Sequence, residues 1–238
     1  MSRIHLISGP RNISTALMYA FGSRPDCSIV DEPFYAYYLM GHPELDHPGR
    51  REILASQSAE FEEVLENIVF GAYPTRHVFI KNMAHHLDKA DWSFLKDLKN
   101  ILLIRNPRQL IASFARVIEQ PTLLDIGIEQ EYRLMRYMLD NDMAFEVLDS
   151  SDLLQAPEPM LQKLCAALDI VFDPSMLKWE KGSRKEDGVW AKYWYGNVHK
   201  SEGFVQRPMS NHPFPSHLED LLEEAMVYYN KIYEFKIN

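Results

Sequence analysis

The stretch GPRNISTAL at residues 9–17 has the residue types of a phosphate-binding turn. It joins a short apolar run to a helical pattern, and backbone N–H groups at a helix N-terminus bind anions whatever the side chains are. Arg11 adds a forked donor that suits phosphate or sulfate oxygens, and Ser14 and Thr15 add hydroxyl donors. The lysine that ends the phosphate loop of nucleotide hydrolases is missing. The turn predicts an anion site of another kind, although an ordinary helix cap with a solvated arginine also explains it.

A second stretch, NILLIRNPRQLIASFAR, ends an apolar run in Arg105 and starts a helix at Pro107. Proline is tolerated in the first turn because its missing N–H would have no helical partner there. Ser113 lies on that helix, eight residues after Arg105. Taken alone, the pattern also describes an arginine that caps a strand and a serine that faces the core.

Two more places hold groups that can exchange protons. The stretch IVDEPFYAYYL contains Asp31 and Glu32, and FIKNMAHHLDKA contains Lys81, His85 and His86. Transfer of a group to a hydroxyl or amine needs a base near the reacting atom. The alternatives are structural, since carboxylates at strand ends are often helix caps and a histidine on the following helix is often a satisfied structural residue.

These residues follow short apolar runs that alternate with longer amphipathic ones, as expected for an α/β fold. The predicted strands are 4–8, 27–31, 77–81, 100–105 and 144–149. Continuous apolar strands of this kind indicate a mainly parallel sheet of about five strands covered on both faces, a three-layer sandwich like that of P-loop nucleotide hydrolases. Ligands bind beyond the carboxyl ends of such strands, where all the polar residues named above are found.

Helices are predicted between the strands from their apolar periodicity. One spans 51–70, with Ile53, Phe61, Leu65 and Ile68 on one side. A C-terminal helix spans 216–236, with a capping box of Ser216 and Glu219. The remaining predicted helices are 14–20, 107–118, 126–142 and 157–170.

Residues 178–210 mix aromatic and basic side chains with glycines and show no clear period. The segment is too aromatic for a disordered linker, so we expect a folded lid or binding loop. We predict that it covers a bound nucleotide, with Lys192 or Lys200 near phosphate and Trp190 or Trp194 near the base.

Together, the turn at 9–17 and the Arg105 stretch resemble the two cofactor signatures of the sulfotransferase family. The family's first loop, Pro-Lys/Arg-Ser-Gly-Thr-Thr, holds the 5′-phosphosulfate of 3′-phosphoadenosine-5′-phosphosulfate. Pro10 and Arg11 match it, with Ser14 and Thr15 in place of the threonine pair. The resemblance covers roughly the first two thirds of the chain in strand order.

The family's second signature has an Arg, a Pro two residues later and a Ser eight residues after the Arg, and it binds the 3′-phosphate. Arg105, Pro107 and Ser113 match it at the same spacing. The resemblance therefore implies a cofactor site made by Arg105 and Ser113 together with the first loop, including Asn12. Asn12 and Ile13 stand where the family usually has Ser-Gly, and a β-branched residue disfavours positive φ, so we expect the backbone at Ile13 to differ.

The resemblance also suggests catalytic residues. Several branches that act on carbohydrate or tyrosine have a glutamate base in the place of Glu32, followed here by Pro33. Cytosolic members have Lys-Thr-His after the third strand, where the lysine steadies the transferring group and the histidine is the base. Lys81 matches that lysine, while His85 and His86 come two and three residues late. We predict Glu32 as the base, with the two histidines as alternatives.

Composition limits the other function classes. The chain has 238 residues, a size suited to a single domain over 1–238, and its net charge of −9 argues against nonspecific nucleic-acid binding. Two cysteines, Cys27 and Cys165, without metal spacing make a disulfide framework or zinc site unlikely. No apolar run approaches the ~18 residues that cross a membrane, and no signal-peptide core is seen. We therefore expect a cytoplasmic protein without membrane or nucleic-acid partners.

The sequence thus predicts a sulfotransferase that moves a sulfuryl group from 3′-phosphoadenosine-5′-phosphosulfate to a hydroxyl or amine of a small-molecule or carbohydrate acceptor, without a metal. A kinase on the same architecture is one alternative. It is disfavoured because the loop lacks the lysine and because Arg105, not a Mg²⁺-binding aspartate, follows the fourth predicted strand. A non-catalytic nucleotide-binding protein is the other alternative.

Overall fold

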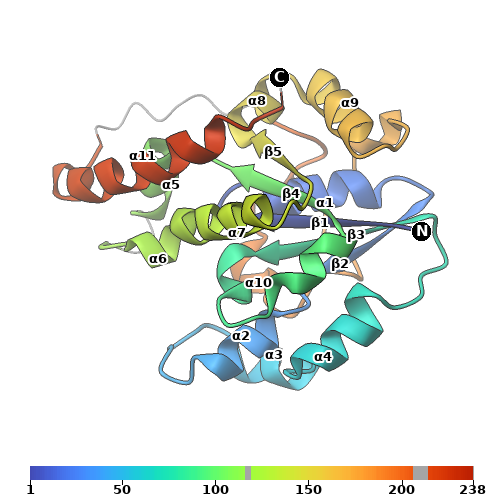
Figure 1. The fold of residues 1–238 in the computed structure, drawn as a ribbon, viewed down its shortest axis with the longest axis horizontal. Coiled ribbons are helices and arrows are strands. Elements are labelled where there is room, and N and C mark those ends of the chain that lie inside the picture. Colours follow the sequence, from blue (N-terminus) through green and yellow to red (C-terminus); the bar gives the residue numbers. More distant parts are fainter. Residues whose placement is uncertain (116–118, 206–213, 238) are drawn as a thin grey trace.

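A five-stranded parallel sheet forms the centre of the molecule, in the order β2-β3-β1-β4-β5 (Figure 1). The computed structural model describes residues 1–115, 119–205 and 214–237. The strands are β1 (Ser2–Ser8), β2 (Cys27–Asp31), β3 (His77–Met83), β4 (Lys99–Ile104) and β5 (Phe145–Asp149). The predicted α/β architecture is confirmed, and each predicted strand is present within two residues of its expected ends.

Helices cover both faces of this sheet (Figure 1). They are α1 (Ser14–Gly22), α2 (Tyr35–Gly41), α3 (Arg50–Ser56), α4 (Phe61–Val64), α5 (Pro107–Phe114), α6 (Leu123–Ile126), α7 (Ile128–Asp140), α8 (Ser150–Gln155), α9 (Pro157–Ala167), α10 (Ala191–Trp194) and α11 (Glu219–Tyr233). Short 3₁₀-helices lie at Ala84–Leu87, Trp92–Asp97, Pro174–Leu177, Val198–Lys200 and Ser216–Leu218, and a π-helical turn at Leu65–Val69. No helix in the described residues is long and apolar enough to cross a membrane.

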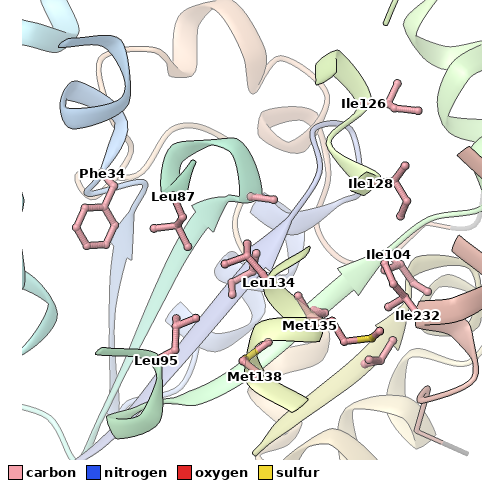
Figure 2. Close-up of a cluster of buried hydrophobic side chains, with 14 of the residues drawn as sticks. Phe34, Leu87, Leu95, Ile104, Ile126, Ile128, Leu134, Met135, Met138 and Ile232 are labelled. Atoms are coloured by element: carbon pink, nitrogen blue, oxygen red, sulfur yellow. The ribbon is translucent and has the colours of Figure 1, made fainter. Parts of the chain in front are cut away.

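The two faces of the sheet bury separate hydrophobic clusters because successive strand residues point in opposite directions. On β1, Ile4 and Leu6 pack with α1 and α9, whereas Ile7 packs on the opposite face with α5, α7 and α11. Figure 2 shows this second cluster, in which Leu134 of α7 and Ile232 of α11 lie over the sheet. The full coverage explains why the strands are apolar on both faces.

The connections diverge between β1 and β4. The chain leaves β1 through α1 toward β2, and it leaves β4 through α5 toward β5, on the other side of the sheet order. In open α/β sheets, ligands bind beyond the carboxyl ends of the strands at such a switch point. Both sequence motifs with arginines begin at this switch point, since one follows β1 and the other follows β4.

The prediction of one continuous helix over 51–70 is wrong. The chain forms α3, breaks at Gln57, and resumes as α4 and the π-helical turn, which leaves Ile68 37 % exposed. Gln57 has extended backbone, and its side-chain amide donates to the Glu32 carbonyl oxygen (3.0 Å) while its oxygen accepts from the Ala36 N–H (3.2 Å). The break lets Gln57 support the turn that carries Glu32.

The start of the C-terminal helix also differs from the prediction. Residues Ser216–Leu218 form a 3₁₀ turn, and α11 begins at Glu219 with Leu218 at the N-cap position and no side-chain cap. The predicted capping box is wrong because this turn places Ser216 one turn before the α-helix. The predicted helix over 107–118 ends at Phe114, and its last residues lie outside the described part of the chain.

Candidate active site

The loop between β1 and α1 holds an unusual backbone conformation. Arg11 and Ile13 both have φ of 60°, in the left-handed region. A β-branched residue disfavours this region, so Ile13 adopts the backbone that a glycine would take most easily, contrary to what its side chain predicts. Ser14 and Thr15 follow in the first turn of α1, as expected.

Asn12 lies inside the molecule. Its side chain is buried, and its Nδ2 donates to the Leu103 carbonyl oxygen of β4 at 2.8 Å. The side chain therefore ties the loop to β4. The predicted contact between Asn12 and the cofactor stays a prediction.

The two arginine motifs meet at the switch point between β1 and β4. Arg11 Nε donates to Ser113 Oγ of α5 at 2.8 Å, and Arg105 Nη1 donates to the Arg11 carbonyl oxygen at 2.7 Å. Burial, followed by the positive charge of Arg11, lowers the pKa of Arg105. Arginine does not lose its proton in proteins, so two guanidinium groups stay charged side by side. An anion with several oxygens would relieve this repulsion and accept hydrogen bonds from both guanidinium groups.

Beyond β2 and β3 lies a buried group of four residues, which we call the base cluster: Asp31, Glu32, Lys81 and Tyr195. Lys81 Nζ donates to Asp31 Oδ1 at 2.9 Å, to Tyr195 Oη at 2.6 Å and to Glu32 Oε1. Tyr195 Oη lies 2.8 Å from both carboxylate oxygens of Asp31 and 3.3 Å from Glu32 Oε1. The three donors of the Lys81 ammonium are therefore all engaged.

The surroundings of Glu32 in the base cluster bring its pKa close to 7. Burial raises the pKa of Glu32 to about 7, Lys81 opposes that rise, and the neighbouring Asp31 adds to it. Burial works against the charge on Lys81, but the two carboxylates outweigh it and raise the pKa of Lys81. A carboxyl group with a pKa near the working pH is suited to accept and release a proton.

Comparison with known proteins decides the family. The profile of the family described as "Sulfotransferase domain" matches residues 2–234. The chain belongs to the sulfotransferase family. Two curated relatives from Arabidopsis thaliana match the chain: branched-chain-amino-acid aminotransferase-like protein 1, 35 % identical over 95 % of the chain, and protein 2, 34 % identical over 97 %. The chain spans 41 % of the length of each.

Solved structures show the same fold at low identity. A sulfotransferase domain from the curacin biosynthetic pathway is 16 % identical, with a TM-score of 0.55 over 95 % of this chain and 98 % of that one. A sulfotransferase domain of an olefin synthase from Synechococcus PCC 7002 is 18 % identical, with a TM-score of 0.53 over 94 % of both chains. A sulfotransferase from Alicyclobacillus acidocaldarius is 12 % identical, with a TM-score of 0.55 over 100 % of this chain and 98 % of that one.

The two candidate histidines differ in their environment. His86 is buried, stacks on Tyr35 with ring centroids 4.3 Å apart, and places Nε2 3.9 Å from Glu32 Oε2. Burial lowers the pKa of His86 well below its ordinary value, so the ring is neutral at pH 7. His85 is half-buried and lies edge-on to Tyr38 at 4.9 Å. The structure brings His86, but not His85, into contact range of the base cluster.

A cavity of about 240 Å³ opens beside His86. Its wall is mainly aromatic and apolar, with a lysine and two histidines among the polar groups. The lining residues are Tyr37, Tyr38, Met40, Gly41, His42, Ala59, His86 and Lys89. Of the aromatic side chains that follow β2, Phe34 and Tyr35 are instead buried in the core.

Tyr195 is the residue that sequence reasoning missed. Its segment also reaches the cluster through the Gly188 N–H, which donates to Asp31 Oδ2 at 3.1 Å, and Trp190 Nε1 donates to Tyr195 Oη at 3.2 Å. A Cβ on Gly188 would lie 2.1 Å from the Trp190 ring, so only glycine fits there. The mixture of glycines and aromatic residues at 178–210 marked the segment as functional, but nothing local distinguishes Tyr195 from its neighbours.

The other residues predicted for the lid are found in varied places. Trp190 is only 2 % exposed, whereas Trp194 is 43 % exposed. Lys192 forms an ion pair with Glu52, and Lys200 is exposed. The end of the predicted lid lies outside the described residues, so closure over a nucleotide stays a prediction.

Proposed function

We propose that the chain transfers a sulfuryl group from 3′-phosphoadenosine-5′-phosphosulfate to a hydroxyl or amine of a small-molecule or carbohydrate acceptor. The observation that carries the proposal is the meeting of the two arginine motifs. They are 94 residues apart in sequence, yet Arg105 binds the Arg11 carbonyl oxygen and Arg11 binds Ser113. A donor with two separate anionic groups suits a site with two adjacent guanidinium groups.

Each motif has its own task in this proposal. The loop N–H groups, Arg11, Ser14 and Thr15 receive the 5′-phosphosulfate, since they surround the N-terminus of α1. Arg105 and Ser113 receive the 3′-phosphate. When the donor enters, Ser113 exchanges its bond with Arg11 for one with phosphate, and Arg11 turns its fork toward the sulfuryl group.

The chemical step needs a base, and the base cluster offers one. The acceptor oxygen or nitrogen attacks sulfur, the bond from sulfur to the phosphate oxygen breaks, and adenosine 3′,5′-bisphosphate leaves. The acceptor proton passes to Glu32, whose pKa of about 7 leaves a good part of the carboxylate ready to accept it. Lys81 then steadies the charge on the sulfuryl oxygens after exchanging one of its three bonds. Tyr195 is the partner most easily exchanged because it is neutral.

The acceptor approaches through the cavity beside His86. Tyr37 and Tyr38 line it, and His86, which also lines it, has its Nε2 3.9 Å from Glu32 Oε2. Its volume of about 240 Å³ suits a single ring or sugar unit better than a polymer in an extended groove. The acceptor is therefore proposed as a small molecule or the end unit of a carbohydrate.

The aminotransferase named in the two plant relatives is not proposed for this chain. Transamination uses a lysine that forms a Schiff base with pyridoxal phosphate, and such a lysine must act as a neutral amine. Lys81 is instead held as an ammonium between Asp31 and Glu32, which raise its pKa. The match also covers only 41 % of each relative.

The decisive experiment is a calorimetric comparison of nucleotides on the whole chain. Adenosine 3′,5′-bisphosphate should bind well, while adenosine 5′-monophosphate and ATP with Mg²⁺ should bind poorly. Preference for ATP with Mg²⁺ would favour the kinase alternative, and binding of none would remove the proposed donor site. Once binding is shown, a screen of alcohols, phenols, amines and sugars with labelled donor identifies the acceptor.

A further inference from the structure

The loop after β1 is held from behind by α7. The N–H of Gly9, the first residue after the strand, donates to Glu131 Oε1 at 3.0 Å. Glu131 is 1 % exposed and lies in the first turn of α7, where its own N–H donates to the Gly127 carbonyl oxygen at 3.1 Å. A side chain from a distant helix therefore sets the direction of the first peptide of the loop.

The close approach of the two segments depends on two glycines. A Cβ on Gly9 would lie 2.5 Å from the Ile126 carbonyl oxygen, and a Cβ on Gly127 would lie 3.3 Å from Gly9 Cα. Gly127 also has φ of 74°, which other residues rarely adopt. The junction of α6 and α7 thus touches the loop directly, and the bond to Glu131 belongs to a closely fitted contact.

The loop needs such support because its conformation is strained. Two non-glycine residues, Arg11 and Ile13, are in the left-handed region, and strain of this kind persists only where the surroundings determine the backbone strongly. The Asn12 side chain and Arg105 hold the middle of the loop. Glu131 is the contact that holds its start.

We propose that Glu131 is a positioning residue of the donor site: by accepting the Gly9 N–H, it orients the loop so that the following N–H groups and Arg11 face the anion. The inference rests on the proposed function, because it assigns the loop to the donor. Glu131 acts through Gly9 and does not touch the nucleotide. The Gly9 N–H correspondingly points to α7 and is not one of the donors to phosphate.

The charge state of Glu131 fits this role. Burial raises the pKa of Glu131 well above its ordinary value, and the bond from Gly9 only partly opposes that rise. This direction favours the neutral carboxyl group, which places no negative charge behind an anion site. A glutamine keeps the same length and the same acceptor oxygen without a charge, so Glu131→Gln preserves the bond from the Gly9 N–H.

Three variants of the whole chain test the inference by calorimetry with adenosine 3′,5′-bisphosphate. Glu131→Gln should bind within about twofold of the wild type. Glu131→Met, which has no strong acceptor, and Glu131→Asp, which is too short to reach Gly9, should each bind about tenfold more weakly or worse, the scale for a buried N–H that loses its acceptor. Glu129→Met, on the same turn of α7, is the control and should bind like the wild type.

Hydrogen exchange without nucleotide gives a second readout. Exchange over residues 4–17 should speed up in Glu131→Met and Glu131→Asp but not in Glu131→Gln, while β4 and β5 stay protected. If Glu131→Met does not fold, the Asp and Gln variants decide. The inference is overturned if Glu131→Met and Glu131→Asp bind the bisphosphate as tightly as the wild type, or if Glu131→Gln loses as much affinity as they do. If the wild type binds no bisphosphate, the proposed donor site is wrong. If hydrogen exchange over residues 4–17 is also unchanged in the variants, Glu131 does not anchor the loop either.

Discussion

Glu32→Gln, which replaces the proposed base with its neutral isostere, should become more stable relative to the wild type as the pH rises. The pKa of Glu32 is about 7 in the folded chain, against an ordinary value of 4.5. The folded state therefore holds a proton on Glu32 over a pH range in which the unfolded chain has lost it. Its stabilising contribution is complete below pH 4.5 and is lost as the pH rises through 7. Glu32→Gln carries no such proton and escapes the loss.

The pKa difference sets the size of the effect. A difference of about 2.5 units, at about 1.4 kcal/mol per unit, corresponds to about 3 kcal/mol of unfolding free energy. The amide oxygen of Gln can still accept from Lys81 and Tyr195, so the cluster keeps its hydrogen bonds. We expect the unfolding free energy of Glu32→Gln minus that of the wild type to rise by about 2–3 kcal/mol between pH 5 and pH 8.

Urea unfolding at several pH values measures this difference. The unfolding free energy of the wild type against pH is not sufficient by itself, because buried histidines change it in the opposite sense. Burial lowers the pKa of His5 to about 4, so the contribution of His5 to stability is lost as the pH falls below 6.5. The difference between the two proteins cancels such shared groups. Glu224→Gln, at an exposed position on α11, is the control and should give a flat difference. A flat or falling difference for Glu32→Gln would refute the raised pKa and with it the poised base.

Four further predictions concern ligand binding and turnover. Arg105→Ala should weaken adenosine 3′,5′-bisphosphate binding by ~1.5–3 kcal/mol, the range for a bond to a charged group, and barely affect adenosine 5′-monophosphate; calorimetry showing equal losses would contradict the 3′-phosphate assignment. Bisphosphate affinity should be the same with and without EDTA, and a large loss on chelation would point to a metal-dependent kinase. Glu32→Gln should lower turnover ~10²–10⁴-fold with bisphosphate affinity kept; near-normal turnover in that variant, together with an inactive His86→Ala, would move the base to the histidine. Hydrogen exchange across residues 185–205 should slow when the bisphosphate binds, and unchanged protection would remove the lid.

Local pattern was sufficient for the sheet. Each strand contains apolar residues, and burial on both faces of the sheet removes the strict alternation of apolar and polar residues. The spacing of Arg105 and Ser113 could also be read locally, because Arg105 directly follows β4 and Ser113 lies on the next helix, although their role in binding the donor stays a prediction. Features that depend on neighbours in the chain can be read from the chain.

Local sequence pattern was not sufficient where a side chain forms a hydrogen bond with a distant part of the chain. Residues 51–70 have helical periodicity, yet Gln57 leaves the helix to bind the backbone around Glu32. The position of Asn12 in the motif likewise gives no sign that its side chain turns inward and donates to the Leu103 carbonyl oxygen. In both cases a hydrogen bond across the fold outweighs a modest local preference.

The sequence by itself determined the order of the elements, the ends of the strands and the arginine motifs, since these follow from residue spacing and backbone sterics. Only the tertiary structure decided that Tyr195 completes a cluster with Asp31 and Glu32, more than 160 residues earlier, and that Glu131 holds Gly9. It also decided the pKa of Glu32, because desolvation and neighbouring charges depend on what the whole fold packs around the carboxyl group. A side chain has the same chemistry anywhere in the chain, but its partners and its exposure to water exist only after distant segments have packed together.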